Sequence, residues 1–187
     1  NMRAKGLLRF ASPNPIIDRS EFSLDGDAII PNRFAHEDGS RKGEDNYTVA
    51  FDSGTSEIRI GRPSGSRTVP AEPGLLDRGS LQVALMRDLG ACRLPGPYRY
   101  VDEDGVKTYR YERLDDRPAE TGIGTLETVR FLQQREGSSR TTQLWLAPSL
   151  AYLPVRIEQI RDGEVDTVFN LDAVSDSLSP SDCSGLR

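Results

Sequence analysis

The stretch YRYVDEDGVKTYRY, residues 98–111, decides the fold class. Two runs of alternating side chains flank the pair Asp104-Gly105. Asp-Gly supplies the positive φ angles that a type I′ turn requires, so this pattern is among the strongest local signals for a β-hairpin. Period-two alternation places Tyr98 and Tyr100 on one face of the first strand, and Tyr109 and Tyr111 on one face of the second. The stretch therefore predicts an antiparallel hairpin.

The same turn signal recurs at Asp25-Gly26, Asp38-Gly39 and Asp162-Gly163, each between short alternating runs. Four such pairs in one chain favour an antiparallel sheet. The sequence therefore predicts a mainly β fold, either a curved antiparallel sheet or an incompletely closed β-barrel. Besides the hairpin, strands are expected at residues 19–24, 28–34, 47–52, 57–60, 125–133, 141–147, 152–161 and 165–171.

One segment has helical spacing. Within residues 75–89, Leu81, Leu85 and Leu89 recur every four residues and form one apolar stripe. Asp77 or Ser80 is the expected N-cap, and Gly90 is the expected C-terminal stop. A single amphipathic helix among strands buries its apolar side on a sheet, so we expect it on or in the concave face.

Length and charge restrict the organisation and the partners. The chain has 187 residues and a net charge of -5, and its basic residues are scattered singly, so nucleic acid is not an expected partner. No apolar run approaches the roughly 18–20 residues of a membrane-spanning helix. We expect one β domain over residues 1–174 and a polar, flexible tail over residues 175–187. The strand-like run at residues 7–10 begins almost at once, which suggests that opening strands are missing.

The residues offer little for catalysis. His36 is the only histidine and lies in a polar run, which favours a solvated surface residue over a catalytic base. No serine lies in a Gly-x-Ser-x-Gly motif, and the carboxylate clusters fall at predicted turns. Cys92 and Cys183, with one histidine, are too few for a usual zinc site; they either form a disulfide in an oxidising compartment or remain free. We therefore expect no enzyme activity, no cofactor and no metal.

Four stretches carry a family resemblance: DRSEF at residues 18–22, LLDRGSLQVAL at 75–85, GIGTLETV at 122–129, and LWLAPSLAYLPVRIEQ at 144–159. Together they resemble the bacterial domain-of-unknown-function family numbered 3108, over roughly residues 6–172. The resemblance implies an exported protein that resides in the periplasm after removal of its signal peptide. It also implies a shape related to lipoprotein carriers of the LolA/LolB type, with an apolar cavity beneath helices, and it brings no catalytic residues.

These observations lead to two functional hypotheses. The first is a periplasmic binding or carrier module for a hydrophobic small molecule, lipid, lipoprotein or apolar peptide. Its expected lining residues are Leu81, Leu85, Met86, Tyr109, Tyr111, Phe131 and Trp145. From the sequence alone, the same residues could equally form an ordinary core. The second hypothesis is a structural protein of an envelope assembly that binds another envelope protein through an exposed sheet edge.

Overall fold

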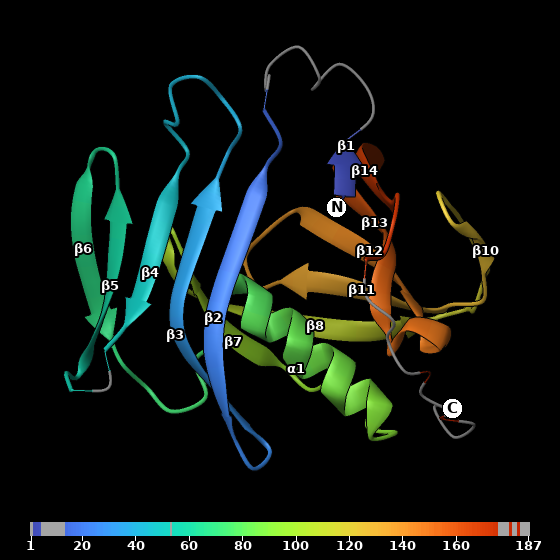
Figure 1. Ribbon diagram of the computed structural model, residues 1–187, viewed down its shortest axis with the longest axis horizontal. Helices are drawn as coiled ribbons and strands as arrows, with labels where there is room; N and C mark the ends of the chain where they lie inside the picture. Colours follow the sequence, from blue (N-terminus) through green and yellow to red (C-terminus); the bar gives the residue numbers. More distant parts are fainter. Residues whose placement is uncertain (1, 5–13, 53, 176–179, 181–182, 184–187) are drawn as a thin grey trace. The chain divides into compact units, whose positions relative to one another are not determined.

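The computed structural model describes residues 2–4, 14–52, 54–175, 180 and 183 (Figure 1). The predicted strand at residues 7–10 and most of the predicted tail lie outside these residues. The chain divides into two compact units. Unit 1 comprises residues 1–6, 85–97 and 109–187, and unit 2 comprises residues 7–84 and 98–108. The prediction of a single domain over residues 1–174 stays a prediction.

Unit 2 contains a five-stranded antiparallel sheet in which every strand pairs with the next along the chain. Its strands are β2 (Ile17–Asp25), β3 (Ala28–Glu37), β4 (Tyr47–Phe51), β5 (Glu57–Arg62) and β6 (Gly65–Pro70). The first half of α1 (Arg78–Gly90) follows the sheet. The hairpin of β7 (Tyr98–Asp102) and β8 (Gly105–Leu114) comes next, and β8 continues into unit 1. Alternation along the strands directs one face of the sheet to the core and the other to solvent.

The core of unit 2 combines the sheet with the segments that follow it. Its buried members are Phe34, Tyr47, Val49, Ile58, Ile60, Leu75 and Val101. Leu75 precedes α1 and Val101 belongs to β7, so both pack on the core face of the sheet. Backbone hydrogen bonds join the same segments, because Val101 N donates to Leu76 O over 2.8 Å and Leu76 N donates to Arg99 O over 3.0 Å.

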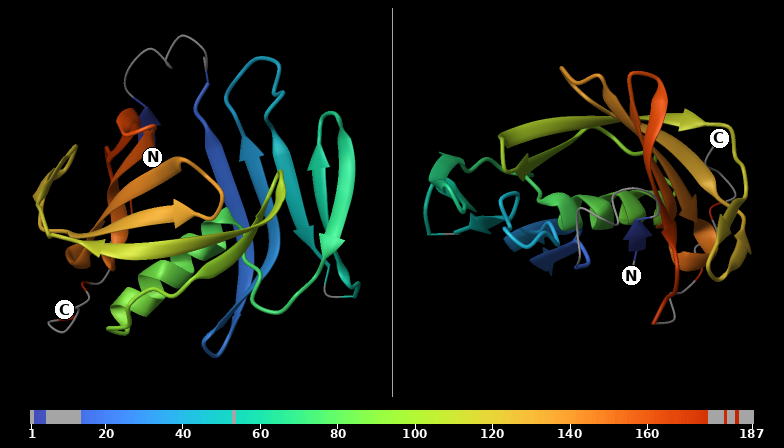
Figure 2. Two further views of the ribbon diagram at one scale, coloured as in Figure 1. Left: turned by 180° about the vertical axis from the view of Figure 1, so that it is seen from behind. Right: turned by 90° about the horizontal axis from the view of Figure 1, so that it is seen from above.

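Unit 1 contains a curved antiparallel sheet in the order β1-β14-β13-β12-β11-β8 (Figure 2). Besides β8, its strands are β1 (Met2–Ala4), β11 (Val129–Arg135), β12 (Arg140–Ala147), β13 (Leu153–Arg161) and β14 (Glu164–Leu171). A separate two-stranded hairpin consists of β9 (Ala119–Thr121) and β10 (Gly124–Leu126). Within the described residues, none of the sheets closes on itself, so the prediction of a mainly β, open antiparallel fold with one helix is confirmed.

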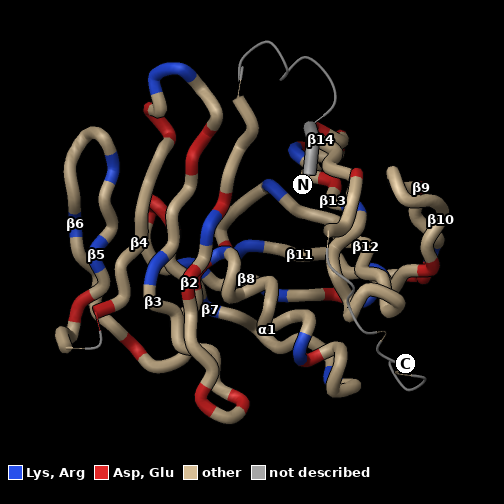
Figure 3. The backbone as a smooth tube through the Cα atoms, viewed as in Figure 1, with Lys and Arg blue, Asp and Glu red and all other residues tan. Residues whose placement is uncertain are grey.

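Three of the four Asp-Gly pairs form the tight hairpins that the sequence predicts, at β2–β3, β7–β8 and β13–β14. Acidic side chains mark the tip of the β2–β3 hairpin (Figure 3). Asp38-Gly39 instead opens the longer loop between β3 and β4. The Asp38 carboxylate accepts hydrogen bonds there from the backbone N–H groups of Ser40 and Asp45. The prediction of a fourth tight hairpin is therefore wrong, because this aspartate organises a wider turn.

Two other strand predictions need correction. The run predicted as one strand over residues 125–133 is divided between β10 and β11, which lie in different sheets. The strand β6 was not predicted, because it is an edge strand with mostly exposed side chains and therefore shows no hydrophobic alternation. Pro154 lies at a bulge, since the β12–β13 register shifts between Trp145 and Leu146.

The helix begins with the predicted N-cap Asp77. Its Oδ1 accepts hydrogen bonds from Gly79 N over 2.8 Å and Ser80 N over 3.0 Å, and Ser80 Oγ lies 2.8 Å from Asp77 N. This reciprocal pattern is a capping box with serine in the place of the usual glutamate. None of the described helices is long and apolar enough to cross a membrane.

The helix ends one residue later than predicted. Gly90 is its last residue, and the left-handed position that usually holds glycine is occupied by Cys92, with φ 59°. Arg93 N donates to Asp88 O and Cys92 N donates to Leu89 O, which is the Schellman pattern. Cys92 forms a disulfide with Cys183. Of the two alternatives that the sequence left open, the structure has the bonded pair.

Candidate functional site

The β2 and α1 stretches that carry the family resemblance meet in unit 2. Ser20 Oγ donates to Asp77 Oδ1 over 2.7 Å, and Arg78 Nη1 lies 3.6 Å from Asp18 Oδ2. Gly79 lies so close to β2 that a Cβ built on it would be 2.4 Å from Ser20 Cβ. The motifs are 57 residues apart at Ser20 and Asp77, and together they fix the start of the helix against the edge of the sheet.

We expect Gly79→Ala to destabilise the protein by about 1–3 kcal/mol, because the new methyl group overpacks the contact with Ser20 Cβ, which is attached directly to strand β2 and cannot move freely. This loss exceeds the gain of about 1 kcal/mol that alanine gives in an unhindered helix. Gly96→Ala is the matched control, since a Cβ there meets no atom within 4 Å. Urea unfolding of both variants measures the difference. A Gly79→Ala protein as stable as Gly96→Ala would contradict the role of the close contact.

Next to this junction, a row of polar side chains crosses four strands on the core face of the sheet. Asp18 on β2 pairs with His36 on β3, which pairs with Tyr47 on β4. On the next pair of strands, Thr48 of β4 pairs with Gly61 of β5. Because the strands are antiparallel, the residue before Thr48, Tyr47, lies opposite the residue after Gly61, Arg62. We call Asp18, His36, Tyr47 and Arg62 the polar row.

The structure corrects the interpretation of His36 as a solvated loop residue. His36 belongs to β3, and only 14% of its side chain is exposed. Its Nδ1 lies 2.6 Å from Asp18 Oδ1, and its ring centroid lies 5.2 Å from that of Tyr47. The carboxylate fixes the orientation of the imidazole. Sequence analysis missed this pair because it depends on the cross-strand register.

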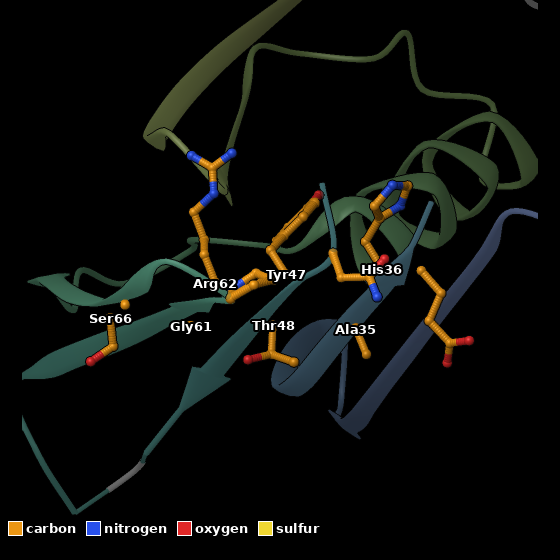
Figure 4. A pocket seen from close by; sticks show the side chains of 11 residues that line it. Ala35, His36, Tyr47, Thr48, Gly61, Arg62 and Ser66 are labelled. Atoms are coloured by element: carbon orange, nitrogen blue, oxygen red, sulfur yellow. The ribbon is translucent and has the colours of Figure 1, made fainter. Parts of the chain in front are cut away.

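A pocket of about 540 Å³ opens at the ends of β3, β4, β5 and β6. Its lining residues are Ala35, His36, Glu37, Asn46, Tyr47, Thr48, Gly61, Arg62, Pro63, Gly65 and Ser66. Figure 4 shows that His36, Tyr47 and Arg62 project from the same side of the strands. In the same view, the side chains of Ala35, Thr48 and Ser66 project to the opposite side, in agreement with the register that aligns them with Gly61. The lining therefore comes from both faces of the sheet.

Two of these groups differ in exposure, since Tyr47 is buried and Arg62 is exposed. Burial raises the pKa of Tyr47 far above its ordinary value, so the phenol stays protonated and remains a hydrogen-bond donor. Neither the Tyr47 hydroxyl nor the Arg62 guanidinium has a hydrogen-bond or ion-pair partner within the part of the chain that the structure describes. Glu37, the acidic residue of the lining, is paired with Arg19 over 2.6 Å.

Unit 1 has a different kind of surface. On one face of its sheet, cross-strand pairing aligns Phe131 on β11, Leu144 on β12, Ile157 on β13 and Phe169 on β14. We call these four residues the apolar row. Phe131 and Leu144 are buried, whereas Ile157 and Phe169 are only half-buried. The β13–β14 end of the row therefore keeps apolar surface accessible.

The seven predicted lining residues fall into different surroundings. Leu81 and Leu85 are buried on α1, and Met86 is half-buried beside them. Half-buried Tyr109 and Tyr111 lie on the same face of the unit 1 sheet as Phe131, because Arg113 on their strand pairs with Phe131. Tyr111 hydroxyl is 2.7 Å from Gln133 Nε2. None of the seven residues lines the pocket of unit 2.

Trp145 does not share a face with Phe131. Phe131 pairs with Leu144, so the next residue, Trp145, points to the opposite face. There it packs with Ala119, Ala147, Val155 and Leu171, between the guanidinium groups of Arg130 and Arg156. The grouping of Trp145 with the other lining residues is not supported by this geometry, and the residue belongs to a core.

Comparison with curated proteins and with solved structures gives no significant match. A family model does match, over residues 1–169. It covers most of the chain and includes all the motifs that carried the resemblance, among them the β2 and helix stretches that meet at Ser20 and Asp77. The chain thus belongs to the family described as Protein of unknown function (DUF3108).

Proposed function

We propose that the chain is a non-catalytic binding module of the bacterial periplasm whose ligand presents an apolar group, such as an acyl chain. The observation that carries this proposal is the half-buried end of the apolar row in unit 1. Adjacent strands are about 4.8 Å apart, so four strands give the row a length of roughly 14 Å. A narrow apolar strip of this length suits a linear hydrocarbon chain.

The neighbouring side chains limit the strip on one side. The next row on the same face contains Tyr111, Gln133, Thr142, Gln159 and Thr167. At the β8 end, Arg113 lies over the ring of Phe131, 5.3 Å from its centroid. An apolar chain placed along the row would therefore be bordered by polar groups, which favours a defined orientation over general adhesion.

The compartment is supported by the bond between Cys92 and Cys183. Disulfides persist in oxidising compartments such as the periplasm and are rare in the cytosol. As part of the same proposal, the chain has a shape related to lipoprotein carriers of the LolA/LolB type.

Native mass spectrometry of protein purified from a bacterial periplasm tests the proposal directly. We expect a lipid-sized adduct that organic solvent removes. The same preparation tests the absence of catalysis, through a screen with ester, glycoside and peptide substrates. Turnover that is lost in His36→Ala would contradict a non-catalytic function, since His36 is the only histidine.

We expect Ile157→Gln to weaken the binding of a fluorescent fatty acid by roughly tenfold or more, because each buried aliphatic side chain contributes about 1.5–3 kcal/mol to apolar contact. Val165→Gln is the matched control, since Val165 is exposed on the neighbouring strand outside the row. Fluorescence titration compares both variants with the parent protein. Equal losses in both variants, or none in Ile157→Gln, would remove the apolar row from the binding site.

A second function is favoured by the edge of the unit 2 sheet. Strand β6 pairs with β5 on one side, ends the strand order, and has mostly exposed side chains. Such an edge can accept an extended segment of another envelope protein through backbone hydrogen bonds. In the native mass spectrum, this function would give a stoichiometric protein partner in place of a lipid adduct.

A further inference from the structure

We propose that the ligand of unit 1 is an amphiphile with a phosphate headgroup, and that Arg135, Arg140 and Arg161 bind this headgroup. We call these three residues the arginine row. The proposal rests on the proposed function, since the acyl chain of the same ligand contacts the apolar row. A separate observation carries it, namely three arginines without acidic partners on three adjacent strands.

The strand register of unit 1 brings the arginine row together. Arg140 on β12 pairs directly with Arg161 on β13. On the other side of β12, Thr141 pairs with Gln134 of β11. Because the strands are antiparallel, the residue after Gln134, Arg135, lies opposite the residue before Thr141, Arg140. Each arginine is an even number of positions from the member of the apolar row on its own strand, so both rows lie on the same face of the sheet.

The arginine row has no acidic partner among the residues that the structure describes. Glu164 of β14 lies opposite Arg161 in the register, and Glu136 and Asp162 lie in the adjoining turns, yet none of the three acids forms an ion pair with the row. Two of the arginines are exposed, and Arg135 is half-buried. Like charges directly opposite each other destabilise a sheet, and a bound anion would remove this repulsion.

Phosphate suits adjacent guanidinium groups better than a carboxylate does. Each guanidinium presents a fork of N–H donors that matches the oxygens of either anion. A phosphate monoester carries a charge of about −1.5 to −2 at neutral pH, whereas a carboxylate carries a single charge. Adjacent strands are about 4.8 Å apart, so the long arginine side chains of neighbouring strands can reach one phosphate group.

The side chains between the two rows suit the linker of such an amphiphile. Half-buried Gln133, Thr142 and Gln159 lie between the rows on β11, β12 and β13. Their amide and hydroxyl groups donate and accept hydrogen bonds, as the ester and hydroxyl groups of a glycerol linker require. Arg135 lies four positions after Phe131 (135 − 131), so at about 3.4 Å per residue the rows are roughly 14 Å apart. A lipid with its phosphate on the arginine row therefore places its linker between the rows and its acyl chain toward the apolar row.

Three probes test the headgroup and the chain separately. Lauroyl lysophosphatidic acid and monolaurin share the same acyl glycerol and differ in the phosphate, and glycerol phosphate is the headgroup without the chain. Isothermal titration calorimetry measures the binding of each lipid below its micelle concentration. We expect lysophosphatidic acid to bind roughly tenfold or more tightly than monolaurin, with a difference that shrinks as salt is added, and glycerol phosphate to bind far more weakly than lysophosphatidic acid.

The decisive variant is Arg140→Gln, which removes the central charge of the arginine row. Its matched control is Arg110→Gln, since Arg110 is exposed on β8 of the same sheet and projects to the opposite face. Arg140→Gln should weaken the binding of lysophosphatidic acid by roughly tenfold or more, the scale of hydrogen bonds to a charged group, and leave monolaurin binding unchanged. Because the substitution also relieves repulsion with Arg161, its urea midpoint should not fall below that of the parent protein.

The outcomes separate the headgroup site from the proposed function. Equal affinities for lysophosphatidic acid and monolaurin, or unchanged lysophosphatidic acid binding by a folded Arg140→Gln protein, would overturn the headgroup site and leave the apolar ligand standing. Glycerol phosphate that binds as tightly as lysophosphatidic acid would also overturn it, because the site would then take a free phosphate. If neither lipid binds, the proposed function fails and the headgroup site fails with it.

Discussion

Replacing Trp145 with alanine is expected to lower the free energy of unfolding by about 3–5 kcal/mol, the usual cost of emptying a buried aromatic site. Only 7% of the residue is exposed, and its ring packs into the cluster with Ala147, Val155 and Leu171. The loss of these contacts leaves a cavity that the surrounding strands cannot close, because β12 is paired on both sides.

The loss is enlarged by the arginines that flank the ring. Arg130 is 8% exposed and its guanidinium carbon lies 4.6 Å from the ring centroid of Trp145. It donates to Asp115 O over 3.1 Å and to Gln143 Oε1 over 2.7 Å, and burial lowers its pKa. A buried cation with neutral acceptors depends on the aromatic face for part of its stabilisation, at about 0.5–2 kcal/mol.

Urea unfolding of Trp145→Ala and Trp145→Phe measures this effect. Phenylalanine keeps an aromatic face for Arg130 and fills most of the volume, so it should recover a large part of the lost stability. A loss below about 1 kcal/mol in the alanine variant would show that the ring is not part of a packed core, since that is the scale of an ordinary surface substitution. Trp145 would then again be a candidate ligand contact.

Removal of the disulfide by the double substitution Cys92→Ser and Cys183→Ser is expected to cost about 4–5 kcal/mol, from the entropy of a closed loop of this length in the unfolded chain. The two cysteines are 91 positions apart, so the bond restricts almost half of the unfolded chain. In the folded protein, the bond also ties residue 183 to the left-handed residue that ends α1.

Guanidinium unfolding with and without a thiol reductant tests this effect. The reductant should lower the midpoint of the parent protein to that of the double variant and leave the double variant unchanged. A parent protein whose midpoint does not respond to the reductant would show that the bond adds nothing to stability.

The sequence predicted most elements because their signals are local. The Asp-Gly pairs at positions 25, 104 and 162 set tight turns through their own backbone preferences, and the strands around them appear as alternating runs. The helix and its N-cap were equally local, since Asp77 and Ser80 hydrogen-bond within one turn. Errors arose where a segment lacks alternation, as in β6, or where the side chain of Asp38 redirected the loop.

The candidate sites could not be predicted in the same way. Asp18, His36, Tyr47 and Arg62 are separated in sequence and become neighbours only through the register of four strands. From the sequence, Phe131 and Trp145 are expected in one lining. A one-residue offset across paired strands places them on opposite faces. Register depends on how whole strands bury their apolar faces, and no short motif specifies it.

The sequence by itself determined the class of the fold, the helix with its cap, and membership of a family, because turn chemistry, periodicity and motifs are properties of adjacent residues. Only the tertiary structure decided which side chains meet. It joined Ser20 to Asp77 across 57 positions, bonded Cys92 to Cys183, and placed the His36 ring against Asp18 rather than in solvent. These contacts depend on long-range packing and strand pairing, whose free energy is shared among many residues and cannot be read from any one of them.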